Sequence, residues 1–148
     1  MKGEAVDILL IEDNSADVEL TLRTFKKNNI ANRVVVIRDG EEALDYLFMR
    51  NSFEEREEGR PKLILLDLKL PKVSGLEILK AIKSDEKLRV IPTVVLTSSR
   101  EENDLIESYN LGANSYIVKP VDFNGFQEAV KNLGLYWLLL NRAPERDI

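Results

Sequence analysis

The segment PKLILLDLKLP, residues 61–71, is the most informative stretch of this chain about its fold. Its centre, Leu63–Asp67, is an uninterrupted apolar run that ends in a carboxylate. A strand on a protein surface alternates apolar and polar side chains, whereas a strand covered on both faces is apolar throughout. We therefore predict that residues 63–67 form a strand of a parallel sheet with helices on both faces.

Four further segments have the composition of buried strands, and segments of helical periodicity separate them. The predicted strands are Val6–Ile11, Arg33–Ile37, Thr93–Thr97 and Ser115–Val118. The predicted helices begin after Asn14 or Ser15, after Asp39-Gly40, at Ser74, near Leu105 and after Asp122. Apolar residues at helical spacing mark their buried faces: Val18, Leu22 and Phe25; Ala43, Leu44 and Leu47; Leu76, Leu79 and Ile82; Leu105, Ile106 and Tyr109; and Phe126, Val130, Leu133 and Trp137.

This alternation predicts an α/β fold, a doubly wound five-stranded parallel sheet in three layers, because parallel strands need right-handed helical crossovers. The 148 residues suit one domain, which we place at 6–140 with a short tail at 141–148. Between the second helix and the third strand, RNSFEEREEGRP at residues 50–61 is rich in both signs of charge. We interpret it as an exposed surface insertion, with a partner-docking element as the alternative.

Composition excludes several functions. The chain has no Cys and no His, so thiol chemistry, imidazole bases and thiolate or imidazole metal sites are ruled out. A net charge of -5 with scattered basic residues argues against nucleic-acid binding. The start, MKGEAVDILLIEDN, is neither a signal peptide nor long enough to cross a bilayer, so we expect a soluble, cytoplasmic protein without membrane contact.

Polar side chains follow the predicted strands where the strands end. Glu12-Asp13 follow the first strand, Asp67 ends the third, Thr97-Ser98 lie at the end of the fourth, and Lys119-Pro120 follow the fifth. The functional crevice of an open α/β sheet lies beyond the carboxyl ends of its strands, so these side chains should meet. Each of these residues alone could be explained as a helix cap or a solvated surface charge. The functional interpretation depends on their occurring together at the strand ends.

Three neighbouring carboxylates repel one another unless a cation lies among them, and oxygen ligands without His or Cys favour Mg²⁺. Asp67 is the candidate nucleophile, since a carboxylate can attack phosphorus and form an aspartyl phosphate. Lys119 would supply a second cation, and the hydroxyl of Thr97 could donate to a phosphoryl oxygen.

With these residues, the motifs ILLIEDN, LILLDLKLPKVSG, VVLTSS and SYIVKP resemble the receiver domains of bacterial response regulators over roughly Asp7 to Leu140. The resemblance implies a flavodoxin-like strand order of 2-1-3-4-5 and a phospho-switch in two-component signalling, not a metabolic enzyme. It implies Mg²⁺ held by Glu12, Asp13, Asp67 and the backbone carbonyl of Lys69, and phosphorylation of Asp67. Thr97 and Tyr116 would be the switch residues, and Lys119, followed by a cis-Pro120, would contact the phosphate.

The insertion and the ending AVKNLGLYWLLLN resemble a subgroup of single-domain regulators, some of which are partners of phytochrome-type histidine kinases. A sensor histidine kinase is therefore the expected phosphodonor. GLYWLLLN also holds more apolar residues than one buried stripe requires, with Leu135, Leu138 and Leu139 at least partly on other faces. We expect a homodimer through the fifth helix and its adjacent surface; burial of these residues within the monomer is the alternative.

Two other functions share part of this chemistry. A haloacid-dehalogenase-like phosphohydrolase also uses Asp, Mg²⁺, Thr and Lys, but it needs a second Asp where this chain has Lys69, which cannot be a general acid near neutral pH. A flavodoxin-like carrier shares the predicted fold, but Glu12 and Asp13 would repel a flavin phosphate.

Overall fold

The computed structural model describes residues 6–30, 32–56, 59–98 and 107–139. The predicted sheet is confirmed: five parallel strands lie in the order β2-β1-β3-β4-β5. Their bounds are β1 Ile8–Ile11, β2 Val34–Ile37, β3 Leu63–Asp67, β4 Thr93–Thr97 and β5 Ser115–Val118. Three of the five predicted strands have the observed bounds, and the other two begin one or two residues later than expected.

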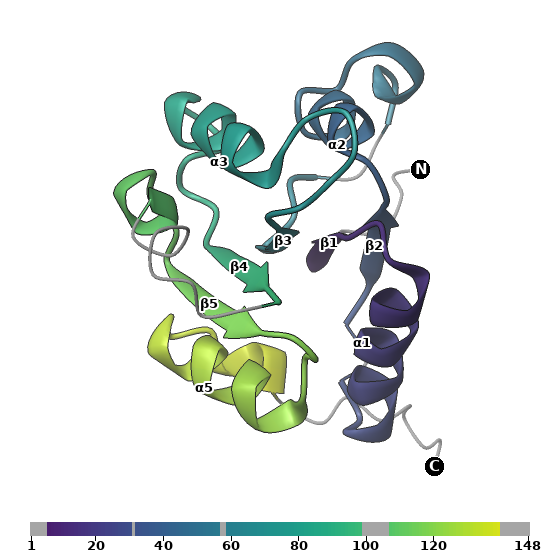
Figure 1. Cartoon of the computed structure of the whole chain (residues 1–148), viewed down its shortest axis with the longest axis vertical. Helices are drawn as coiled ribbons and strands as arrows, with labels where there is room; N and C mark the ends of the chain where they lie inside the picture. Colours follow the sequence, from purple (N-terminus) through teal and green to yellow (C-terminus); the bar gives the residue numbers. More distant parts are fainter. Residues whose placement is uncertain (1–5, 31, 57–58, 99–106, 140–148) are drawn as a thin grey trace.

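Helices cover both faces of this sheet, with α1 and α5 on one side and α2 and α3 on the other (Figure 1). Their bounds are α1 Ser15–Lys27, α2 Gly40–Leu47, α3 Gly75–Ser84 and α5 Phe123–Asn132, with short 3₁₀ turns at Asn51–Phe53 and Tyr136–Leu139. Residues 107–110 are also helical, and Gly112 follows with a φ of +106°. Leu105 and Ile106, predicted for this fourth helix, lie outside the described residues.

Alternation along the strands divides the core into two clusters. Ile8 and Leu10 of β1 face α1 and α5, whereas Leu9 and Ile11 face α2 and α3. Every residue of β1, β3 and β4 is buried, as expected for strands that serve both clusters. On the first face the rings of Phe25 and Phe126, 4.7 Å apart between centroids, join α1 to α5.

Polar caps fix the helix starts. Asn14, Asp39, Ser74 and Asp122 precede α1, α2, α3 and α5, and each side chain accepts a backbone N–H three residues later. In α1 the expected buried stripe was partly wrong: Leu22 is exposed and Thr21 is buried instead. Thr21 tolerates burial because its hydroxyl donates to the carbonyl of Asp17 at 2.8 Å.

The fifth helix is shorter than predicted. It ends at Asn132 because Gly134 adopts the left-handed conformation, with a φ of +73°, and a helix commonly ends at such a residue. Phe126 and Val130 are buried and Leu133 packs against the same core, as predicted, but Trp137 lies beyond the helix, and the side chains of Trp137 and Leu138 are outside the described residues. Leu135 and Leu139 pack, partly buried, against the core cluster under α1 and α5, which is burial within the monomer, the alternative to a dimer face.

Most described residues of the insertion are exposed, as expected, but two of its side chains pack against α2. Phe53 packs edge-on against Tyr46 of α2, with ring centroids 5.1 Å apart. The guanidinium of Arg56 lies 4.1 Å from the centre of the same ring, and its Nε donates to the Tyr46 carbonyl at 2.9 Å. The described part of the insertion is thus attached to α2, whereas Glu54 and Glu55 are exposed.

Candidate functional site

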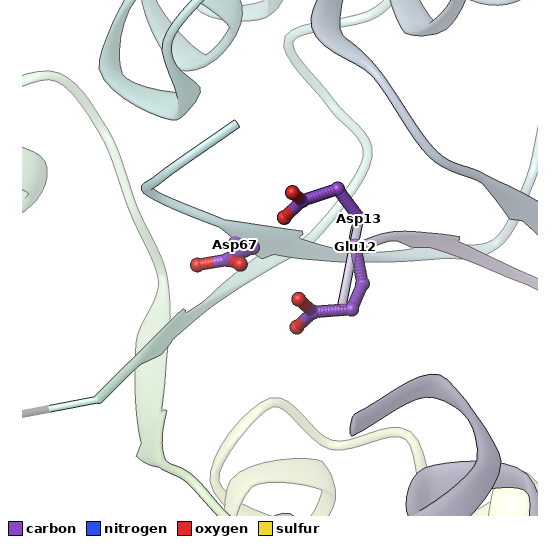
Figure 2. Close-up of side chains that lie close together, drawn as sticks. All are labelled: Glu12, Asp13 and Asp67. Carbon is purple, nitrogen blue, oxygen red and sulfur yellow. The ribbon is translucent and has the colours of Figure 1, made fainter. Parts of the chain in front are cut away.

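The carboxylates predicted for the metal site meet at the carboxyl ends of β1 and β3. Asp67 is the last residue of β3, and Glu12 and Asp13 directly follow β1, its neighbour in the sheet. One oxygen from each side chain lies within 4.8 Å of the others, and the carboxylates turn toward a common space (Figure 2). Glu12 and Asp67 are buried and Asp13 is exposed. We call these residues the acidic cluster.

Lys119, the residue after β5, reaches across the edge of the sheet to this cluster. Its Nζ atom lies 3.1 and 3.3 Å from the two carboxylate oxygens of Glu12 and 3.2 Å from Oδ2 of Asp67. The Lys119 backbone N–H donates to the Thr97 carbonyl at 2.8 Å, which ties this residue to the end of β4. The Lys119–Pro120 peptide bond is cis.

Two residues of the segment 68–75 fix the surroundings of Asp67. The backbone N–H of Lys69 donates to Oδ1 of Asp67 at 3.2 Å, while the Lys69 side chain is exposed and lines the pocket at this edge. Gly75, the first residue of α3, packs so closely that a Cβ atom there would lie 2.2 Å from the Asp67 carbonyl oxygen. A glycine is required here because α3 begins against the backbone of the acidic cluster.

Burial and mutual repulsion perturb the charges of this site. Burial, together with the hydrogen bonding and charge of Asp67, raises the pKa of Glu12 to about 7 from 4.5, against opposing effects of Lys119 and the Asn14 N–H. Burial alone would lower the pKa of Lys119, but hydrogen bonds to Asp17 and Glu12 and the nearby negative charges raise it. A cation among the carboxylates therefore has an electrostatic reason to bind, and the oxygen-only donor set of the acidic cluster fits Mg²⁺ or Mn²⁺.

The predicted switch residues lie on β4 and β5. Thr97 is buried at the end of β4, in register with Val118. Tyr116 is half-buried, and its ring packs edge-on against Tyr109, with centroids 6.1 Å apart.

Sequence reasoning missed Asp17. Its Oδ2 lies 3.0 Å from Nζ of Lys119, a shorter distance than those of Glu12 and Asp67. An acid in the first turn of a helix is common, because the helix dipole favours it, so nothing in its position in the sequence distinguished it.

Comparison with known proteins identifies the fold and the family. The family model described as the response regulator receiver domain matches residues 8–131. The chain belongs to this family. Receiver domains are signalling modules of two-component systems that are phosphorylated on Asp and interact with histidine kinases.

The related proteins match this chain over most of their own length. The probable methanogenesis regulatory protein FilR2 of Methanothrix harundinacea is 44% identical, with 93% of this chain and 86% of the relative covered. Response regulator Rcp1 of Synechocystis is 40% identical, with 88% of each covered. The crystal structure of Mn²⁺-bound Rcp1 is similar to this structure, with a TM-score of 0.74 and 39% sequence identity. The match covers 90% of this chain and 94% of the Rcp1 chain.

The bacteriophytochrome response regulator AtBRR is 56% identical, with a TM-score of 0.84 and coverage of 95% of this chain and all of its own. The stand-alone regulator subgroup predicted from the sequence is thus confirmed, whereas the phosphohydrolase alternative finds no support in these matches. Within the described ranges, no helix is long and apolar enough to cross a membrane.

Proposed function

We propose that this receiver domain is a stand-alone phospho-switch in which a partner histidine kinase passes a phosphoryl group to Asp67 in a Mg²⁺-dependent reaction. The observation that carries the proposal is the position of the Asp67 carboxylate, which lies 3.2 Å from the ammonium of Lys119 and beside Glu12 and Asp13. One carboxylate in this arrangement can act as nucleophile while the others bind a cation.

Glu12, Asp13, Asp67 and the backbone carbonyl of Lys69 are the groups proposed to hold Mg²⁺. When bound, the ion would offset the negative charge of the transferring phosphoryl group. The presence of Mn²⁺ in the solved form of Rcp1 supports a divalent-cation site at this edge of the sheet. In this chain a bound cation would offset the repulsion between the neighbouring carboxylates of Glu12, Asp13 and Asp67.

In the proposed transfer, a carboxylate oxygen of Asp67 attacks the phosphorus of a phosphohistidine. The new O–P bond forms as the P–N bond breaks, and the electron pair of that bond remains on the histidine nitrogen. Lys119 and the hydroxyl of Thr97 donate to the phosphoryl oxygens. Later attack of water on phosphorus releases phosphate and restores the carboxylate.

The output of the switch is proposed to be a change at β5 and α5. Thr97 would turn toward the phosphoryl group and Tyr116 would follow it, leaving its contact with Tyr109. The identity with AtBRR supports a phytochrome-type kinase as the source of the phosphoryl group. We also propose that the domain spans 6–140, beyond the family match, because Leu135 and Leu139 pack against its core.

A homodimer through α5 and its neighbouring surface is a separate part of the proposal. Its support is the exposure of two aromatic residues: Tyr109, at 44%, which lines a pocket between β5 and α5 together with Tyr116, and Tyr136, at 59%, which follows α5. Light scattering over a range of concentrations, with and without beryllofluoride, tests this part. A mass that stays monomeric at high micromolar concentration in both states would exclude the dimer.

Intact-mass spectrometry after incubation with acetyl phosphate tests the central proposal. We expect a phosphoryl adduct with Mg²⁺, none after EDTA treatment, and none in Asp67→Ala. Phosphorylation by a cognate kinase should depend on Mg²⁺ and on Asp67 in the same way. An undiminished adduct in Asp67→Ala would assign the chemistry to another residue.

A further inference from the structure

Asp17 is the acidic side chain near the site that the phosphotransfer scheme leaves without a role. It lies in the first turn of α1, 102 residues from Lys119 along the chain, and its Oδ2 approaches Nζ of Lys119 to 3.0 Å. The side chains of Lys119 and Asp17 are only 13% and 29% exposed, so water screens this ion pair less than a surface pair. Asp17 also lines the pocket that contains Asp67.

The hydrogen-bonding capacity of Lys119 is fully committed. An ammonium group has three N–H donors, and Nζ of Lys119 contacts three carboxylates, those of Glu12, Asp17 and Asp67. A phosphoryl oxygen on Asp67 can therefore reach this ammonium only by drawing it away from partners that it already has. Phosphorylation removes the charge of the Asp67 carboxylate itself, so Asp17 and Glu12 remain as the charged competitors.

We infer that Asp17 competes with the phosphoryl group for Lys119 and thereby weakens the phosphorylated state relative to the resting state. The inference rests on the proposed role of Asp67 as phosphoacceptor. Glu12 belongs to the proposed metal set, so a cation can satisfy it when Lys119 leaves. Asp17 lies outside the acidic cluster, so it loses its partner when Lys119 moves toward the phosphoryl oxygens.

The contacts that hold Asp17 in α1 are made by its backbone and not by its carboxylate. The helix start is fixed by the Asp17 backbone N–H, which donates to Oδ1 of Asn14 at 3.0 Å. On the other side, the hydroxyl of Thr21 donates to the Asp17 carbonyl at 2.8 Å. Neither contact uses the Asp17 side chain, so replacing its carboxylate should leave the helix in place apart from a small dipole contribution.

The test is the dissociation constant of beryllofluoride, a phosphoryl mimic, measured by calorimetry in saturating Mg²⁺ for the whole chain. Asp17→Asn and Asp17→Ala should bind beryllofluoride roughly threefold to tenfold more tightly than the wild type. Asp17→Glu, which keeps the charge, should remain near the wild type. Glu19→Gln is the matched control, because it removes one charge from the same helix at a side chain that is 72% exposed and paired with Arg23.

A purely structural role for Asp17 predicts weaker binding in Asp17→Asn and Asp17→Ala, which would overturn the inference, as would unchanged binding. Repetition in about 0.5 M salt separates contact from long-range charge, because screening then acts within a few ångström. If the variants still bind beryllofluoride more tightly than the wild type in high salt, competition for Lys119 is supported. If the difference in affinity vanishes, the inference is overturned. If the wild type itself binds no beryllofluoride, the proposed function fails, an outcome distinct from failure of the Asp17 inference alone.

Discussion

Nζ of Lys119 lies 3.2 Å from Oδ2 of Asp67, although 52 residues separate them in the chain. The contact exists because β3 and β5 flank β4 and both end at the same edge of the sheet. The ammonium is the cation that offsets the buried negative charge of Glu12 and Asp67 in the absence of metal.

Replacing this ammonium should impair both chemistry and stability. Lys119→Met leaves Glu12 and Asp67 without their cation, so we expect the free energy of unfolding without Mg²⁺ to fall by about 1–3 kcal/mol. Phosphorylation by acetyl phosphate should also fall sharply. Urea unfolding and intact mass measure the two effects, and Lys62→Met, at an exposed lysine, is the control. A variant that labels as fast as the wild type would exclude a role for Lys119 in the transfer.

Mg²⁺ binding should depend on pH through Glu12. Its pKa is raised from 4.5 to about 7, so the folded state binds this proton more tightly than the unfolded chain. The contribution of Glu12 to stability without metal is therefore greatest below about pH 4.5 and declines as the pH rises to about 7.

Because Mg²⁺ requires the ionised carboxylate, its affinity should fall below about pH 7, by up to about tenfold per pH unit. Calorimetry between about pH 6 and pH 8 measures this dependence. Glu12→Gln should bind Mg²⁺ more weakly and lose most of the dependence. If the Mg²⁺ affinity of Glu12→Gln depended on pH as steeply as that of the wild type, the titrating group would be a residue other than Glu12.

Gly75 should tolerate no side chain. A Cβ atom at this position would lie 2.2 Å from the Asp67 carbonyl oxygen and 2.5 Å from Cα of Leu68, and backbone atoms cannot move aside as a flexible side chain can. We expect Gly75→Ala to lower the free energy of unfolding by about 2–3 kcal/mol and to slow labelling of Asp67. Gly59→Ala is the matched control, since nothing lies within 4 Å of its added Cβ. Equal stability of the two variants would contradict the close packing.

Phe53 should contribute to stability without contributing to chemistry. Phe53→Ala removes the edge-on contact with Tyr46, so we expect a loss of about 1–2 kcal/mol. Labelling by acetyl phosphate should be unchanged, because Phe53 lies before β3 and the acidic cluster lies beyond its other end. Thermal unfolding measures the loss, and Glu54→Ala, at an exposed neighbouring residue, is the control. Reduced labelling of folded Phe53→Ala would mean that the insertion acts on the site.

Sequence patterns predict the sheet well because all residues of β1, β3 and β4 are buried, which an unbroken apolar run indicates directly. The end of α5 was missed because apolar residues continue at helical spacing past Gly134, although a glycine at that position is itself a signal for a helix end. The acidic cluster was predictable because each member adjoins a strand end. Asp17 was not, because it lies in the first turn of α1, where an acid is common, and not at a strand end.

The insertion precedes β3, whereas Asp67 ends that strand, so a five-residue strand of roughly 17 Å separates them. Since the chain contains no cysteine, Glu54→Cys would introduce a unique thiol on an exposed residue at the opposite end of the sheet. A fluorophore attached to that thiol could report association with a kinase or a second copy while leaving the phosphoacceptor chemistry undisturbed.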